Sequence, residues 1–336
     1  MASRIRIAID CMGGDFGLRV SIPAAVISLS QFSDIDLTLV GDQSAIESAL
    51  PNAERSRLTI VHAPDVVEMS DKPSHALRKK SQSSMRLAID LLQQKQVDAV
   101  VSAGNTGALM AMGCYVLKTL PGIDRPAICS AVPSTTGHSY LLDLGANVDS
   151  SAQHLHQFAV MGSALACAVD GIERPRVALL NIGEEAIKGN EQVKLADTLI
   201  QANQQLSYIG FIEGDGLFAA NADVIVADGF VGNVALKACE GTAGYISAIL
   251  NDSFKASLLS RLAGFFALPV LKRIYQKLDP EQYNGASFLG LQGVVVKSHG
   301  SSNVKGFVHA IEQARLEVSS NMLDMIDQQL AALSEN

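Results

Sequence analysis

Polar and glycine residues gather directly after several short apolar runs, and their types favour anion binding. These clusters lie at 10–15, 104–107, 143–147, 181–189, 228–233 and 297–303. Glycine lets an anion approach the backbone, and the first N–H groups of a following helix carry partial positive charge. A single cluster of this kind is equally an ordinary turn or helix cap. Six clusters at corresponding positions predict a phosphate-binding crevice.

Within these clusters a smaller set of residues is expected to contact the anion. It comprises Asp10, Gly13, Gly14, Asp15, Asn105, Thr106, Gly107, Asp228, Gly229, Gly232, Ser302 and Asn303. Positive charge nearby is expected from Lys188, Lys297, His299 and Lys305. The residue types indicate phosphate, and they leave open whether it belongs to a nucleotide, a substrate or an inorganic ion.

Other motifs argue against a bound cofactor or metal. Gly214-Asp215-Gly216 with Ala219 matches part of a dinucleotide fingerprint, but the acidic residue about 20 positions on should follow a second strand. Glu240 stands at that distance within a helical stretch. The five cysteines form no C-x-x-C pair, so neither a disulfide framework nor a structural zinc site is expected. Neither pattern therefore indicates a structural metal or a bound dinucleotide.

The elements that must position the clusters are short strands alternating with helices. The clearest strand-like runs are 5–9, 37–40, 58–62, 99–102, 139–142, 177–181, 224–226 and 293–297. Most are apolar throughout, which is typical of parallel strands buried on both faces. The pattern predicts a three-layer α/β/α fold with a largely parallel sheet, in one domain (1–336) of two lobes sharing that sheet. Because the carboxyl ends of parallel strands meet at one edge, the clusters are expected to line one crevice.

Composition narrows the class of protein. The 336 residues are 48% hydrophobic and 18% charged, which excludes a disordered chain. With 26 basic and 34 acidic residues the net charge is -8, so a nucleic-acid partner is not expected. The longest apolar run, 262–271, is too short to span a bilayer, and the first residues lack a signal-peptide layout. We expect a soluble, cytoplasmic protein.

The segment 254–278 stands apart because it contains basic residues and no acidic ones. The basic residues are Lys255, Arg261, Lys272, Arg273 and Lys277. Leu258, Leu262, Phe265 and Phe266 share one helical face, and Pro269 is expected to break the helix and form a protruding amphipathic hairpin. One interpretation is a buried hairpin or a dimer contact. The other is a peripheral contact with an anionic membrane surface.

Seven segments, in order, resemble motifs of the PlsX family of bacterial phosphate acyltransferases. They are IAIDCMGGDFG, KPSHALRKKSQSSM, VSAGNTGALM, LLDLGANVD, LLNIGEEAIKGN, IVADGFVGNVALK and VVVKSHGSSN. The resemblance runs from about Ile5 to about Glu317, and Leu18 departs from the proline that the family often has there. It implies a fold similar to isocitrate and isopropylmalate dehydrogenases and to phosphotransacetylases, a homodimer, and no metal or nucleotide cofactor.

The resemblance also implies a reaction and its partners. An acyl group passes from acyl-acyl carrier protein to inorganic phosphate, and the acyl phosphate then serves a membrane glycerol-3-phosphate acyltransferase of the PlsY type. Phosphate is largely dianionic near neutral pH, so we expect direct attack on the thioester without a cysteine nucleophile. A dehydrogenase on the same fold and a non-catalytic membrane scaffold remain the alternatives.

Within this interpretation three groups of residues receive roles. The expected catalytic residues are Lys188, Asn233 and His299. The expected docking surface for the acidic carrier protein is Arg78, Lys79, Lys80 and Arg86. The expected membrane contacts, on the inner face of the cell membrane, are Leu258, Leu262, Phe265 and Phe266.

Overall fold

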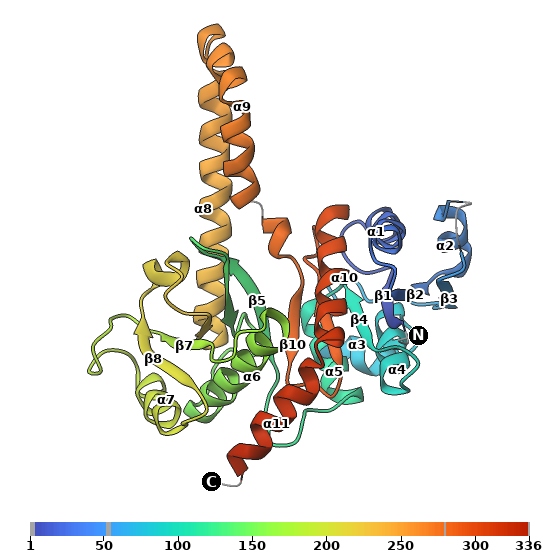
Figure 1. The fold of residues 1–336 in the computed structure, drawn as a ribbon. Coiled ribbons are helices and arrows are strands. Elements are labelled where there is room, and N and C mark those ends of the chain that lie inside the picture. Colours follow the sequence, from blue (N-terminus) through green and yellow to red (C-terminus); the bar gives the residue numbers. More distant parts are fainter. Residues whose placement is uncertain (1–3, 52–54, 279, 335–336) are drawn as a thin grey trace.

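The computed structural model describes residues 4–51, 55–278 and 280–334, and in this part of the chain eleven strands form one sheet (Figure 1). The strands are β1 (Ile5–Asp10), β2 (Ile35–Gly41), β3 (Leu58–His62), β4 (Ala99–Ser102), β5 (Ala127–Pro133), β6 (His138–Leu142), β7 (Arg176–Leu180), β8 (Ser207–Ile212), β9 (Val224–Val226), β10 (Ala286–Leu289) and β11 (Val294–Lys297). Their spatial order is β3-β2-β1-β4-β11-β10-β5-β6-β9-β7-β8.

Helices cover both faces of this sheet, so the predicted three-layer α/β/α fold is confirmed. The α-helices are α1 (Leu18–Gln31), α2 (Gln43–Ala49), α3 (Pro73–Lys79), α4 (Ser84–Gln93), α5 (Thr106–Val116), α6 (Ala152–Asp170), α7 (Glu191–Ala202), α8 (Gly229–Lys255), α9 (Leu258–Leu278), α10 (Val304–Ser319) and α11 (Met322–Ser334). Two short 3-10 helices, η1 (Gly214–Phe218) and η2 (Pro280–Tyr283), complete the set.

Alternate residues of the central strands enter two separate hydrophobic cores, one on each face. In β11, for example, Val294 and Val296 belong to the core under α1, α6, α10 and α11, whereas Val295 belongs to the core under α4 and α5. Both faces of the strand are therefore buried, which explains why its sequence is apolar throughout.

The direction of the strands changes in the middle of the sheet. β10 pairs antiparallel with both β11 and β5, and β5 pairs antiparallel with β6. β9 and β7 follow β6 in parallel, so these strands run opposite to β1, β4 and β11. The sheet is mixed, and its βα loops leave from two opposite edges.

We call these edge A and edge B. The loops after β1, β4 and β11, at 11–17, 103–105 and 298–303, lie at edge A. The loops after β6, β7 and β9, at 143–151, 181–190 and 227–228, lie at edge B. The prediction that all six clusters line one crevice is therefore wrong, because the antiparallel pairing of β5 with β6 reverses the direction of the strands from β6 to β8.

The helices α8 and α9 form a long hairpin that projects from the body of the molecule (Figure 1). α8 is continuous over 27 residues, about 40 Å, and the chain turns at 256–257. The prediction of a turn at Pro269 is wrong, because Pro269 lies inside α9. Side chains at 273–280, including the predicted basic residues Arg273 and Lys277, lie outside the described residues.

No helix in the described ranges combines the length and the apolar character that crossing a bilayer requires.

Candidate active site

At edge A the carboxyl end of β1 is fixed by a buried carboxylate. Asp10 is 1% exposed and accepts hydrogen bonds from the hydroxyls of Ser84 and Ser102, each at 2.6 Å. Burial raises its pKa, although both hydroxyls act in the opposite direction. A Cβ at Gly13 would lie 2.6 Å from the Asp10 Oδ2 atom, so glycine allows the loop to close over the carboxylate. Asp10 thus fixes the position of the 11–17 loop that follows β1.

The loops after β1, β4 and β11 contact one another directly. The Asp15 N–H donates to the Gly300 carbonyl at 2.9 Å. Gly14 adopts a φ of +83°, and a Cβ there would lie 2.9 Å from the Ala103 Cβ. The structure therefore brings Gly13, Gly14 and Asp15 together with the 298–303 loop, as the anion-site prediction requires.

A buried lysine lies where these loops meet. Lys297 ends β11, is 7% exposed, and donates hydrogen bonds to the carbonyls of Ala103 (3.2 Å) and Ser298. Burial lowers its pKa to about 8, while Asp10 and Asp15 favour the charged form and Lys237 opposes it. The sequence indicated Lys297 only as a nearby charge, since an apolar strand does not reveal that its last side chain is buried.

His299 adjoins this lysine and meets the hairpin. Its Nε2 lies 3.4 Å from the Lys237 ammonium, and its Nδ1 lies 2.9 Å from the Ser301 hydroxyl. Burial, and then the charge of Lys237, lowers the pKa of His299. Lys237 also pairs with Glu240 at 2.7 Å. The sequence prediction missed Lys237, although its position four residues after Asn233 places both on one helical face.

Ser302 and Asn303 are engaged in local structure. The Ser302 hydroxyl donates to Glu281 at 2.7 Å and accepts from Asn284 at 3.0 Å. The Asn303 side chain caps α10 by accepting from the Gly306 N–H at 3.1 Å. Both residues hold the edge A loop in place.

Asn105 likewise fixes a neighbouring loop. Its Oδ1 caps α5 through the Ala108 N–H at 3.0 Å, and its Nδ2 donates to the carbonyls of Met69 (2.8 Å) and Asp71 (3.0 Å). The adjacent Thr106 and Gly107 are exposed. Both residues are therefore accessible at the start of α5.

At edge B a second buried carboxylate organises the loop after β6. Asp143 accepts hydrogen bonds from the N–H groups of Ile128 (2.9 Å), Ala146 (3.0 Å) and Asn147 (2.8 Å). Added Cβ atoms at Gly229 and Gly232 would overlap the backbone oxygens of Asn147 and Asp143. These two glycines therefore allow α8 to pack closely against the 143–147 loop.

The remaining edge B candidates have the following places. Asp228 caps α8 through the Val231 N–H at 3.0 Å, and the Asn233 amide donates to the Leu144 carbonyl at 2.9 Å. Lys188 is exposed on the loop after β7. Because β7 and β11 run in opposite directions, Lys188 and His299 leave from opposite edges of the sheet in one chain.

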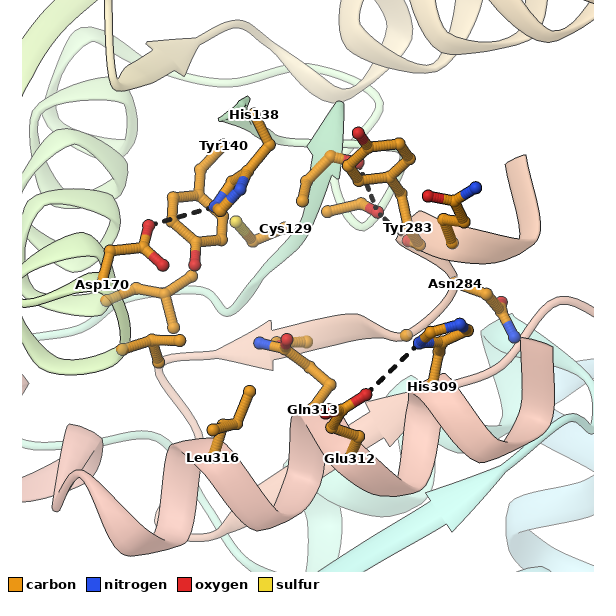
Figure 2. A pocket seen from close by; sticks show the side chains of 17 residues that line it. Cys129, His138, Tyr140, Asp170, Tyr283, Asn284, His309, Glu312, Gln313 and Leu316 are labelled. Atoms are coloured by element: carbon orange, nitrogen blue, oxygen red, sulfur yellow. Dashed lines mark hydrogen bonds and ion pairs between the residues drawn. The ribbon is translucent and has the colours of Figure 1, made fainter. Parts of the chain in front are cut away.

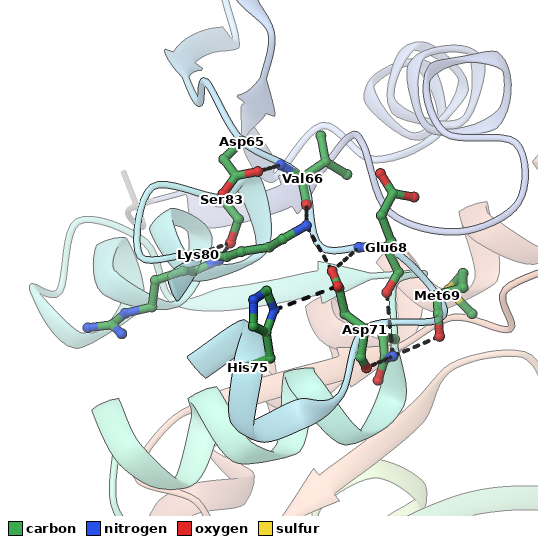
Figure 3. Close-up of polar contacts among 10 residues, drawn as sticks. Asp65, Val66, Glu68, Met69, Asp71, His75, Lys80 and Ser83 are labelled. Atoms are coloured by element: carbon green, nitrogen blue, oxygen red, sulfur yellow. Dashed lines mark hydrogen bonds and ion pairs between the residues drawn. The ribbon is translucent and has the colours of Figure 1, made fainter. Parts of the chain in front are cut away.

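The four basic residues that were expected to dock the carrier protein differ in their exposure and in their ion pairs. Lys80 pairs with Asp71 at 2.8 Å and donates to the Val66 carbonyl (Figure 3). Arg86 pairs with Asp90 at 2.9 Å. Arg78 and Lys79 are exposed at the end of α3, so they are the two members of the set that can meet a partner.

The four expected membrane contacts are strongly exposed along α9. Leu258 is 83%, Leu262 57%, Phe265 67% and Phe266 74% exposed. Gly264 is buried against Phe254 of α8, so the α8–α9 seam lies on another side of the helix.

A cavity of about 280 Å³ lies between α6, α10 and the strands β5 and β6 (Figure 2). Two histidine–carboxylate pairs line it: His138 with Asp170 at 3.1 Å and His309 with Glu312 at 3.3 Å. Asn284 also lines it and donates to Ser298 at 2.8 Å, next to the edge A site. None of the site residues predicted from the sequence lines this cavity.

The dinucleotide alternative gains no support from the local structure. Gly214–Phe218 forms a five-residue 3-10 helix after β8. A dinucleotide fingerprint instead requires its glycines to open an α-helix that presents N–H groups to the pyrophosphate.

Comparisons with known proteins agree with the resemblance. A family model described as "Fatty acid synthesis protein" matches residues 5–325. A phosphate acyltransferase from Hydrogenovibrio crunogenus is 54% identical over 333 residues, which cover 98% of this chain and 99% of the relative. One from Pseudomonas putida is 57% identical over 319 residues, covering 94% and 95%.

Solved structures support the fold independently. A phosphotransacetylase from Streptococcus pyogenes matches with a TM-score of 0.62 at 17% identity, and 94% of each chain is covered. At this identity the match shows the fold, and the near full-length identity to named acyltransferases shows the family. The chain therefore belongs to the PlsX family of phosphate acyltransferases, enzymes that transfer an acyl group to phosphate.

Proposed function

We propose that this phosphate acyltransferase takes its acyl group from acyl-acyl carrier protein and transfers it to inorganic phosphate, giving acyl phosphate for phospholipid synthesis. The observation that carries the proposal is the cationic site at edge A. There Lys237 contacts His299, the charge of Lys297 acts on the same imidazole, and the 11–17 loop bonds to Gly300. Such a site suits a small dianion without a nucleotide attached.

The chemistry needs little beyond positioning and charge stabilisation. A phosphate oxygen attacks the thioester carbon, and the tetrahedral oxyanion collapses with cleavage of the C–S bond. The electron pair leaves with sulfur, and the thiolate takes a proton from solvent. Because an alkyl thiol has a pKa near 8.5, it is an adequate leaving group. The lysines stabilise charge, while the lowered pKa of His299 keeps its imidazole neutral and able to hydrogen-bond.

The cysteines support direct attack. Cys11 and Cys129 are buried, and burial raises the pKa of both thiols. A thiol must ionise to act as a nucleophile, so these two are poorly placed to form an acyl-enzyme.

Two features of the surface support the proposed donor and the proposed membrane contact. Arg78 and Lys79 offer exposed positive charge to an acidic carrier protein, and steering of this kind depends on ionic strength. The exposed apolar side chains of α9 suit a peripheral membrane contact. There a homodimer would release acyl phosphate to a glycerol-3-phosphate acyltransferase of the PlsY type.

The decisive experiment incubates the purified protein with palmitoyl-acyl carrier protein, with and without inorganic phosphate. We expect acyl phosphate and free carrier protein only when phosphate is present, and slower turnover when palmitoyl-coenzyme A replaces the carrier. Thioester loss that is independent of phosphate, or free palmitate as the first product, would overturn the proposal.

A further inference from the structure

We propose that Lys297 is a catalytic residue of the phosphate acyltransferase reaction and that its buried ammonium group binds the attacking phosphate. This inference rests on the family's transfer to phosphate and does not depend on which thioester donates the acyl group.

The hydrogen bonds of Lys297 leave one donor for a ligand. An ammonium group has three N–H donors. Two are directed at the Ala103 and Ser298 carbonyls. Among the described residues no third acceptor engages the group, and no carboxylate lies within ion-pair distance of it.

Lys297 is 7% exposed, and a buried ammonium group without an ion-pair partner destabilises the fold. Such a group is retained where its charge is used. Asp10 acts on the lysine electrostatically but forms no ion pair with it, and its two carboxylate oxygens accept hydrogen bonds from serine hydroxyls. A phosphate dianion supplies the missing negative charge and the missing acceptor together.

The surroundings of Lys297 fit a bound phosphate. The titratable groups that act on it are Asp10, Asp15 and Lys237, and His299 follows two residues on. The 11–17 loop reaches the same place through the bond from the Asp15 N–H to the Gly300 carbonyl. Phosphate bound there would lie between two lysines and against a glycine-rich backbone.

A purely structural role is the competing explanation. Lys297 would then serve only to fasten the loop after β4 to the loop after β11, through the Ala103 and Ser298 carbonyls. The two roles predict opposite effects on stability. If Lys297 only links the two loops, its replacement lowers the melting temperature. If it is an unpaired buried charge, replacing it by an apolar side chain of similar length maintains or raises the melting temperature.

The test compares Lys297→Met and Lys297→Arg with Lys194→Met, which changes an exposed lysine on α7. Steady-state kinetics, isothermal titration with inorganic phosphate and thermal melting are measured for each variant. We expect Lys297→Met to lose about 100- to 1000-fold in kcat/KM for phosphate and to melt at or above the wild-type temperature. Lys194→Met should match wild type, and Lys297→Arg should retain part of the activity.

A measurement on the wild-type protein keeps the proposal testable if the variants fold poorly. Phosphate is almost fully dianionic above pH 8, so its own charge is then constant. We expect the affinity for inorganic phosphate to fall as the pH rises through about 8, the pKa of Lys297. A Lys237→Met variant should show a similar fall displaced to higher pH, because Lys237 lowers the pKa of Lys297. Constant affinity from pH 8 to 9.5 would overturn the proposal. So would near-wild-type kinetics, or a lowered melting temperature with unchanged phosphate affinity, in Lys297→Met. A failure to use acyl-acyl carrier protein would instead refute only the proposed donor.

Discussion

The contact of α9 with membranes can be tested through two of its exposed apolar side chains. Leu262 and Phe266 are 57% and 74% exposed, one turn apart on the helix. Full burial of such a side chain contributes about 1.5–3 kcal/mol, so the exposed fractions correspond to about 1–2 kcal/mol each. Their sum, about 3 kcal/mol, is more than a 100-fold change in membrane partitioning. Basic residues nearby add about 1 kcal/mol each at an anionic surface.

The perturbation is the double substitution Leu262→Glu with Phe266→Glu. The assay is flotation on liposomes with and without anionic lipid, combined with size-exclusion chromatography and soluble acyltransferase activity. We expect binding to anionic liposomes to fall at least 100-fold while activity and oligomeric state stay unchanged. Leu195→Glu is the matched control, because Leu195 is 56% exposed on α7, outside the hairpin. Undiminished liposome binding, or dissociation of a dimer, would show that this face has another role.

Four further predictions concern residues outside α9. Arg78→Glu with Lys79→Glu should raise the KM for carrier protein several-fold at low salt and leave that for phosphate unchanged; a change in both would argue against docking. Gly232→Ala should destabilise by at least about 1–3 kcal/mol, because its Cβ would overlap a backbone oxygen. Gly241→Ala, with open space around it in the same helix, should stabilise by up to about 1 kcal/mol in the same melting assay. Lys188→Ala should lower turnover at least 100-fold if this lysine stabilises the oxyanion; unchanged kinetics would remove it from the site.

The layers of the fold could be predicted because they depend on local patterns. Strands buried on both faces must be apolar throughout, and β1, β4 and β11 carry that pattern in the sequence. The direction of each strand depends on pairings between distant segments. β5 and β10 are absent from the clearest strands predicted. The antiparallel pairing of β5 with β6 sends the loops of the two halves to opposite edges, whereas β10 is a single strand inserted antiparallel between β11 and β5.

The sequence predicted which loops form the site, but it predicted the function of the individual side chains only in part. Glycines near 13–14 do lie against the 298–303 loop, as an anion site requires. By contrast, the amides of Asn105 and Asn233 are bonded to backbone carbonyls, a use that depends on neighbours distant in sequence. The burial of Lys297 is equally non-local, since it depends on the loops after β1 and β4 closing over the end of β11.

The helix α8 explains why a glycine cluster at edge B matters for a site at edge A. Gly229 and Gly232 let the start of α8 pack against the 143–147 loop without steric overlap. Lys237 lies about 7.5 Å from Gly232 along the helix axis. The packing at Gly232 therefore fixes the position along α8 at which Lys237 contacts His299. The same rigid helix continues for 18 residues beyond Lys237 to its end at Lys255, next to the hairpin turn. A bulkier residue at position 232 should therefore displace Lys237 and lower activity without touching phosphate itself. Gly229 and Gly232 are better explained by the close packing of α8 against the 143–147 loop than by phosphate binding.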